Sequence, residues 1–256
     1  MATDMTQHDS FGILWFGSSL ILVAASPQSG KTAFTIQACF SAAEEGLSPA
    51  VYFSTSSGNI WQLRKLLFIH QMADSKWADS SSAFRTLPDI PVYLEEYDNP
   101  PVETLVQRII FYAKEKKAKL FVIDNLQLVD CSMLSPNRDV EDEYDNALRL
   151  LKSLVSTLSI TILVTTRLSR HCEESAPTVR DILNITEAEE HCDQILLMHS
   201  RLSDSLNTDS SLHRITKFTL AQGYPELHNC EEITEVQAKW DVENVSFTRI
   251  GPFPDK

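Results

Sequence analysis

Apolar residues recur along the chain in two alternating patterns. Short apolar runs predict buried β-strands at residues 19–25, 50–54, 92–96, 120–124, 160–166, 195–200, 214–222 and 245–250. Segments with apolar positions at helical spacing predict helices at residues 31–46, 60–72, 100–117 and 140–158. In the third of these helices, Pro100 and Pro101 suit the start, and Leu105, Ile109 and Tyr112 lie on one face. Strands that alternate with helices are typical of an α/β fold, in which helices flank a mostly parallel, twisted sheet.

Length and composition fit one large α/β domain. The chain has 256 residues, and 43% of them are hydrophobic, which is enough for a sizeable core. Its 22 Lys and Arg residues are outnumbered by 35 Asp and Glu residues, giving a formal net charge of −13. Such a surface as a whole repels nucleic acid and anionic membranes, so contact with DNA needs a local basic patch.

The sequence indicates neither a membrane span nor export. A long uncharged run, residues 11–30, is interrupted by glycine and serine and is a poor match to the roughly 20 apolar residues of a bilayer span. The opening residues lack the cationic start and apolar core of a signal peptide. The five cysteines are widely spaced and form no Cys-x-x-Cys pair, which argues against a disulfide framework. We therefore expect a cytoplasmic protein with free thiols and no membrane partner.

The segment 25–32, Ala-Ser-Pro-Gln-Ser-Gly-Lys-Thr, joins a predicted strand to a predicted helix. Backbone N–H groups and a helix N-terminus at such a junction can surround a triphosphate. Lys31 would neutralise the β- and γ-phosphates, and the Thr32 hydroxyl would ligate Mg²⁺. Ala25 stands where the strict phosphate-loop motif has its first glycine. The predicted nucleotide-binding residues are Ser26, Pro27, Gln28, Ser29, Gly30, Lys31 and Thr32.

A second element of a nucleotide site is Asp124, which ends the predicted buried strand 120–124. A carboxylate at the end of a central strand can hold magnesium through water. Two further strands lie between Thr32 and Asp124, as a RecA-like sheet requires. We therefore expect ATP and Mg²⁺ as cofactors, with Thr32 and Asp124 on the metal side. The chain contains neither the Asn-Lys-x-Asp base reader of GTPases nor the Ser-Gly-Gly-Gln signature of ABC ATPases.

Several segments, in this order and spacing, resemble the C-terminal motor domain of DnaB-type hexameric replicative helicases. They include "LILVAASPQSGKTAF", "VYFSTSSGNIWQLRKLL", "LFVIDNLQLV" and "SITILVTTRLSR", and the similarity runs from residue 18 to residue 249. The family's phosphate loop also carries alanine at the position of Ala25. The resemblance implies a RecA-like P-loop NTPase fold that hydrolyses ATP between subunits while moving on single-stranded DNA. We therefore expect an N-terminal extension over residues 1–17 and a single RecA-like ATPase domain over residues 18–256.

The departures from the family pattern fall on catalytic positions. Ser56 stands where the family has the glutamate that polarises the attacking water, and a serine cannot act as that base. Ala221 and Gly223 stand where the family has a Lys-x-Arg finger that reaches the neighbouring subunit's γ-phosphate. Thr166 and Arg167 replace the family's Ser-Gln sensor pair. The resemblance therefore predicts a nucleotide-binding domain with degenerate catalytic positions.

Three charged residues are candidate substitutes for the altered positions. Glu95 and Glu96 end the strand 92–96, and the carboxyl ends of parallel strands face the ligand crevice. Arg167 could replace a missing cation. The alternative is that each of the three is simply a solvated charge.

The resemblance also places single-stranded DNA near two loops, after the strands 120–124 and 160–166. Their candidate DNA-binding residues are Arg138, Arg167 and Arg170, because phosphate contacts need Lys or Arg. Acidic residues flank both loops, so a weak grip on DNA is at least as consistent with the sequence as a strong one. Another expected partner is a DnaB-type helicase, in a ring or a mixed oligomer.

Two functions are consistent with these features. One is an ATP-binding DnaB-like helicase motor domain that acts in DNA replication, with impaired hydrolysis. The other is a catalytically degenerate nucleotide-binding paralogue that regulates assembly with a protein partner. Ser56, Ala221 and Gly223 favour the second, whereas Lys31, Thr32 and Asp124 argue against a complete loss of nucleotide binding.

Overall fold

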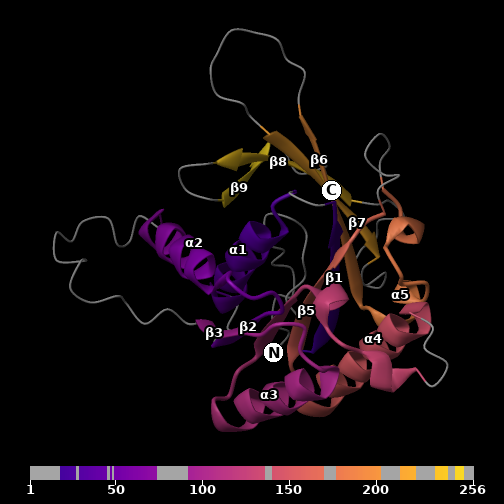
Figure 1. Cartoon of the computed structure of the whole chain (residues 1–256). Coiled ribbons are helices and arrows are strands. Elements are labelled where there is room, and N and C mark those ends of the chain that lie inside the picture. Colours follow the sequence, from indigo (N-terminus) through magenta and orange to yellow (C-terminus); the bar gives the residue numbers. More distant parts are fainter. Residues whose placement is uncertain are drawn as a thin grey trace, which may run out of the picture.

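The computed structural model of the chain describes residues 18–26, 29–44, 47, 49–73, 92–135, 140–169, 177–202, 214–222, 234–241 and 246–250. These residues form one nine-stranded sheet in the order β3-β2-β4-β5-β1-β6-β7-β8-β9, with helices on both faces (Figure 1). The strands are β1 (Ser19–Ala25), β2 (Ala50–Ser54), β3 (Val92–Glu96), β4 (Leu120–Asp124), β5 (Thr161–Arg167), β6 (Gln194–Leu202), β7 (Arg214–Gln222), β8 (Thr234–Asp241) and β9 (Ser246–Ile250). The α-helices are α1 (Lys31–Glu44), α2 (Ile60–Ala73), α3 (Val102–Glu115), α4 (Val140–Leu158) and α5 (Ala188–His191).

The sheet has a parallel part and an antiparallel part. Strands β3, β2, β4, β5, β1 and β6 pair in parallel, and β7, β8 and β9 continue the sheet beyond β6 in antiparallel pairs. The prediction of a mostly parallel sheet flanked by helices is confirmed. Strand β8 was not among the predicted strands. Its sequence, TEVQAKWD, alternates apolar with charged or polar residues and so lacks the continuous apolar run of a strand buried on both faces.

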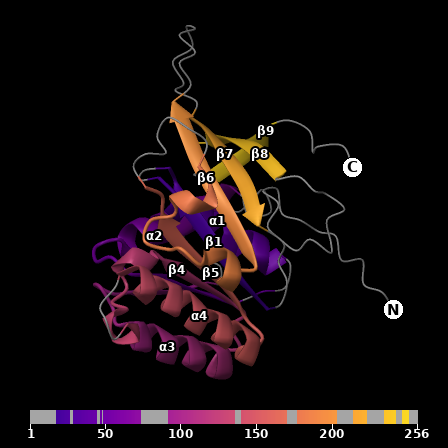
Figure 2. The same cartoon turned by 90° about the vertical axis from the view of Figure 1, so that its right-hand side faces the viewer.

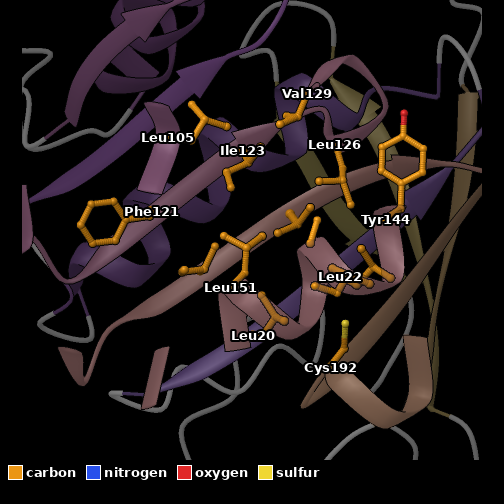
Figure 3. Close-up of a cluster of buried hydrophobic side chains, with 14 of the residues drawn as sticks. Leu20, Leu22, Leu105, Phe121, Ile123, Leu126, Val129, Tyr144, Leu151 and Cys192 are labelled. Carbon is orange, nitrogen blue, oxygen red and sulfur yellow. The ribbon is translucent and has the colours of Figure 1, made fainter. Parts of the chain in front are cut away.

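Alternate residues of the central strands pack into two separate cores. In β1, Leu20, Leu22 and Ala24 belong to the cluster under α3 and α4, whereas Ile21 and Val23 belong to the cluster under α1 and α2. Figure 2 shows the two helical layers, and Figure 3 shows part of the first cluster. All five side chains are fully buried, because a parallel strand between helices has no solvent-exposed face.

Strand register brings the carboxyl ends of the central strands to one edge of the sheet. Ser54 of β2 pairs with Asp124 of β4, and Ala25 of β1 pairs with Arg167 of β5. The loop between β1 and α1 therefore begins beside the end of β5 and close to the end of β4. This edge is where open α/β sheets bind their ligands.

Two carboxylates connect helix α4 to neighbouring parts of the fold. Asp193 accepts a hydrogen bond of 2.7 Å from the backbone N–H of Leu20 and forms an ion pair with Lys152. The buried Asp145 accepts hydrogen bonds from the backbone N–H and the hydroxyl of Thr186, at 3.2 and 2.7 Å.

Within the described part of the chain, no helix combines the length and the apolar character needed to cross a membrane.

Candidate nucleotide-binding site

A tight turn connects β1 to α1 at the carboxyl edge of the sheet. The Ser29 backbone N–H and hydroxyl both donate to the Ser26 carbonyl, at 3.3 and 2.7 Å, and the Phe34 N–H donates to the Gly30 carbonyl at 2.9 Å. Gly30 has a φ of 90°, a left-handed conformation that glycine adopts without strain. The predicted loop residues Pro27 and Gln28 lie outside the described residues. The described part of the turn has the strand–loop–helix form that the phosphate-loop motif requires.

Lys31, the first residue of α1, folds back over the turn. Its ammonium group donates to the carbonyls of Ala25 and Ser26, at 3.0 and 3.3 Å. Burial lowers the pKa of Lys31 to about 8, although the nearby Asp124 carboxylate raises it, and the positive charge of Arg167 lowers it further. The side chain is thus a partly desolvated cation at the loop, which an anionic ligand would stabilise.

Thr32, predicted from the phosphate-loop motif, and Asp124, predicted from the end of a buried strand, are in direct contact. The Thr32 hydroxyl donates to Asp124 Oδ2 at 2.8 Å. Two further hydroxyls hold the same carboxylate: Tyr52 donates to Oδ2 at 2.7 Å, and Thr165 donates to Oδ1 at 2.6 Å. Asp124 is therefore oriented by side chains from α1, β2 and β5 at once.

Sequence reasoning missed Tyr52 and Thr165. Tyr52 is fully buried, and its hydroxyl lies 3.0 Å from that of Thr35, which also donates to the Thr32 carbonyl at 2.9 Å. Burial, together with the charge of Asp124, raises the pKa of the Tyr52 phenol. A tyrosine or threonine inside an otherwise apolar central strand is a usable signal, because a buried hydroxyl needs a partner. That signal does not identify the partner.

The groups at this edge fit Mg²⁺ with a phosphate ligand. The Thr32 hydroxyl and the Asp124 carboxylate are hard oxygen donors, the kind that magnesium prefers. The buried side-chain oxygens of Ser26, Asn125 and Gln127 have no hydrogen-bond partner among the described residues. Such buried polar atoms are costly unless something satisfies them, so a polar ligand at this edge suits their chemistry.

The end of β2 offers a hydroxyl where the family resemblance predicts an acid. Ser56 follows β2, and its carbonyl accepts a hydrogen bond of 3.1 Å from the Ser54 hydroxyl. The neighbouring Thr55 binds the backbone of Asn125 in both directions through its hydroxyl, at 2.8 Å each. The segment is thus fixed next to Asp124, but Ser56 itself brings no group that can deprotonate water.

Glu95, one of the candidate substitute bases, connects β3 to α3. It accepts hydrogen bonds from Arg108 Nε at 3.0 Å and from the Tyr112 hydroxyl at 2.6 Å, and it also binds the Tyr97 hydroxyl. Burial alone would raise the pKa of Glu95, but hydrogen bonds from Arg108 and the two tyrosines hold it below its usual value. Its carboxylate is therefore occupied by structural partners.

Glu96, the other candidate base, caps a helix. Its Oε1 accepts hydrogen bonds from the backbone N–H groups of Asn59 and Ile60, at 2.7 and 2.8 Å, where α2 begins. Helix N-termini leave such N–H groups without intrahelical partners, so the carboxylate stabilises α2 there. Both glutamates therefore have structural partners in this conformation.

Arg167 lies at the carboxyl edge of the sheet beside the turn, whereas Ala221 lies farther back in the sheet, opposite the early part of β6. Arg167 is exposed at the end of β5, beside Ala25, and it is close enough to Lys31 to influence the pKa of that lysine. Thr166, the residue before it, is buried and accepts a hydrogen bond from the Gln127 side-chain amide. Ala221 lies at a register shift between β6 and β7. The residues on either side of it, Leu220 and Gln222, pair with the consecutive residues Leu196 and Ile195 of β6, so Ala221 itself is left without a paired residue in that ladder. Gly223 and the candidate DNA-binding residues Arg138 and Arg170 lie outside the described residues.

Comparison with known proteins identifies the family. The family described as "DnaB-like helicase C terminal domain" matches residues 1–223, most of the chain. The chain belongs to this family. A similar relative, the replicative DNA helicase DnaB of Mycoplasma pneumoniae, is 27% identical over 223 residues, covering 78% of this chain and 46% of the relative. DnaB of Geobacillus stearothermophilus is 23% identical over 234 residues, covering 86% and 51%. This DnaB-like chain thus spans about half the length of these relatives.

Solved structures agree with the fold of this DnaB-like domain. One, titled as an ATPase domain, superposes with a TM-score of 0.72 at 18% identity, covering 93% of this chain and 86% of the other. A structure titled for a DnaB-like replicative helicase and its interactions with primase gives a TM-score of 0.70 at 16% identity, covering 93% and 60%. The predicted RecA-like fold is therefore confirmed.

We expect Tyr52→Phe to weaken Mg²⁺-dependent nucleotide binding by about tenfold, because it removes one of the hydroxyls that orient the Asp124 carboxylate. The measurement is calorimetric titration of ATP at several Mg²⁺ concentrations. Tyr112→Phe is the matched control, since its hydroxyl binds Glu95 instead. Equal Mg²⁺ dependence in the two variants would contradict this role for Tyr52.

We expect nucleotide affinity to fall as the pH rises from 7 to 9. With a pKa of about 8, Lys31 of the free protein loses its proton in this range, whereas bound phosphates favour the charged form. Binding above pH 8 must therefore take up a proton, and affinity at pH 9 should be roughly tenfold lower than at pH 7. Calorimetry in two buffers of different ionisation enthalpy measures the proton uptake. Binding at pH 9 without proton uptake would rule out a titrating Lys31.

Proposed function

We propose that this chain is the ATP-binding motor domain of a DnaB-like replicative helicase and acts in DNA replication. One observation carries the proposal: the Thr32 hydroxyl donates to Asp124 at 2.8 Å, directly beyond a turn that presents Lys31. A phosphate-loop threonine beside a strand-end carboxylate is the arrangement that holds magnesium in P-loop NTPases. Membership of the DnaB-like family supports the assignment, and relatives in that family are named replicative DNA helicases.

In this proposal, the residues of the site contact the phosphates, hold the metal or position another residue. The loop from Ser26 to Thr32 surrounds the phosphates, and Lys31 exchanges its contacts with the Ala25 and Ser26 carbonyls for contacts with phosphate oxygens. Thr32 and Asp124 hold the metal, which neutralises charge on the phosphates when it is bound. Tyr52 and Thr165 keep the carboxylate of Asp124 in place.

We infer that hydrolysis by the isolated chain is slow. Ser56 supplies no base, and the two glutamates near it have structural partners. Ala221 supplies no finger cation. Among the described residues, Arg167 is a cation placed to act on phosphates within the same chain, since it lies beside Ala25 and its charge lowers the pKa of Lys31. A single cation without a base gives only part of the rate acceleration of a complete site.

Single-stranded DNA is the proposed substrate of the motor, and its proposed contacts are Arg138, Arg167 and Arg170. A net charge of −13 makes these local contacts essential, because the rest of the surface repels DNA.

The proposed assembly is a ring, either of this chain alone or mixed with a DnaB-type helicase. The proposed compartment is the cytoplasm, where buried thiols such as those of Cys39 and Cys131 stay reduced.

A second function is favoured by the same altered positions. With Ser56 and Ala221 in place of a base and a finger, the chain retains the groups that bind nucleotide and lacks those that hydrolyse it. A subunit of this kind can use bound nucleotide to control assembly with a helicase partner. In a RecA-type ring it would receive a finger from its neighbour and supply none.

Lys31→Ala tests the nucleotide site. Loss of the ammonium should weaken Mg-ATP binding at least tenfold, because the loop then lacks its only phosphate-neutralising side chain among the described loop residues. Calorimetry measures the affinity, and Lys114→Ala, on α3, is a control for loss of one positive charge. Equal affinity in wild type and Lys31→Ala would remove the phosphate-loop assignment.

Mixing with an active DnaB-type helicase from the same cell separates the two functions. We expect the isolated chain to turn over ATP well below the range of about 1–100 s⁻¹ that competent phosphoryl-transfer enzymes reach. Adding it to the helicase should raise hydrolysis and form a larger complex, measured by phosphate release and light scattering. A homohexamer that unwinds DNA unaided would establish the ordinary motor function and contradict the accessory one.

A further inference from the structure

The phosphate loop is in contact with the last strand of the sheet. Gly30 has a φ of 90°, and a Cβ atom placed on it would lie 2.7 Å from Phe247 Cζ. The Phe247 ring therefore rests directly against the Gly30 backbone. Phe247 is 4% exposed and comes from β9, which Figure 1 shows beside α1. Residues far apart in the chain thus meet at the turn that precedes Lys31.

Two sets of contacts hold Phe247 at this place. The side-chain amide of Gln37, in α1, pairs with the Phe247 backbone in both directions: its Nε2 donates to the carbonyl at 3.0 Å, and its Oε1 accepts from the N–H at 2.8 Å. The ring also packs edge-on against Phe34 and Phe218, with centroid distances of 6.4 and 5.3 Å. Helix α1 and the aromatic cluster therefore fix the ring from two sides.

A glycine-containing turn is pre-organised only if its surroundings restrict it. Gly30 has no side chain of its own to limit its backbone, so the ring of Phe247 is what occupies the space beside it. Restricting a loop to its binding conformation increases affinity, because less conformational freedom is lost when the ligand binds.

We propose that Phe247 is a positioning residue for the phosphate loop, which couples strand β9 to nucleotide affinity without touching the nucleotide. The inference rests on the proposed function, since it concerns the same loop. Coupling of this kind is reciprocal: if β9 favours the binding conformation of the loop, bound Mg-ATP favours the docked position of β9. The carboxyl-terminal part of the sheet is then a place from which a neighbouring subunit can alter nucleotide binding.

The test compares Mg-ATP affinity in the full chain and three variants. Phe247→Leu keeps an apolar side chain but withdraws the ring from Gly30, and we expect roughly fivefold weaker binding or more. Phe121→Leu is the matched control, because it makes the same change at a fully buried ring in the other core cluster, the one under α3 and α4. We expect its affinity to stay within about twofold of wild type. Calorimetry is done at a temperature where circular dichroism shows each variant folded.

Gln37→Ala is the third variant, which leaves all three rings intact and removes only the amide pair on the Phe247 backbone. Gln37→Ala should also weaken Mg-ATP binding. If Phe247→Leu fails to fold, the affinity of Gln37→Ala alone tests the coupling. Hydrogen exchange provides a readout from the other direction: Mg-ATP should slow exchange in β9 of the wild type.

The outcomes separate this inference from the function on which it rests. Wild type that does not bind Mg-ATP would overturn the proposed function itself. Wild type that binds, with Phe247→Leu and Gln37→Ala both at wild-type affinity, would overturn only the coupling. Equal losses in Phe247→Leu and Phe121→Leu would also overturn it, because a general loss of packing would then account for both.

Discussion

The carboxylate of Asp124 is the group on which the arrangement of the site depends. A partly buried charge is costly unless donors surround it, and here three hydroxyls, of Thr32, Tyr52 and Thr165, donate to its two oxygens. These donors come from α1, β2 and β5, so the contacts that satisfy one charge also fix the phosphate-loop helix relative to three central strands. The contacts of this one carboxylate therefore place the Thr32 hydroxyl and the Asp124 oxygens side by side.

The proposed site combines the groups that bind nucleotide with an altered catalytic position. In this proposal Lys31, Thr32 and Asp124 contact phosphates and metal, whereas Ser56 replaces the expected acid. The nearby carboxylate of Glu96 stabilises the start of α2, where its Oε1 accepts two backbone hydrogen bonds. Binding and hydrolysis place different demands on side chains, so a DnaB-like domain can keep one and lose the other.

The last antiparallel strand, β9, contacts the turn between β1 and α1. Like the central strands, β9 contributes to a helical core, because Phe247 belongs to the cluster under α1 and α2. Through Phe247 it packs against Gly30, and through the Gln37 amide it is attached to the helix that follows the loop. The resemblance to DnaB-type helicases implies a ring of subunits. In such a ring, a neighbouring subunit that contacts β9 could change nucleotide affinity through the contact between Phe247 and Gly30.

The sequence by itself determined the features that are local in the chain. Apolar runs located the parallel strands, because a strand buried on both faces needs consecutive apolar residues. The order Gly-Lys-Thr followed by Asp124 pointed to the two segments that meet in the hydrogen bond between Thr32 and Asp124. Tertiary structure alone decided which buried hydroxyls meet Asp124, which partners occupy Glu95, and which ring rests on Gly30. The physical reason is that these contacts depend on strand order and register, which bring together residues far apart in sequence and which no local pattern encodes.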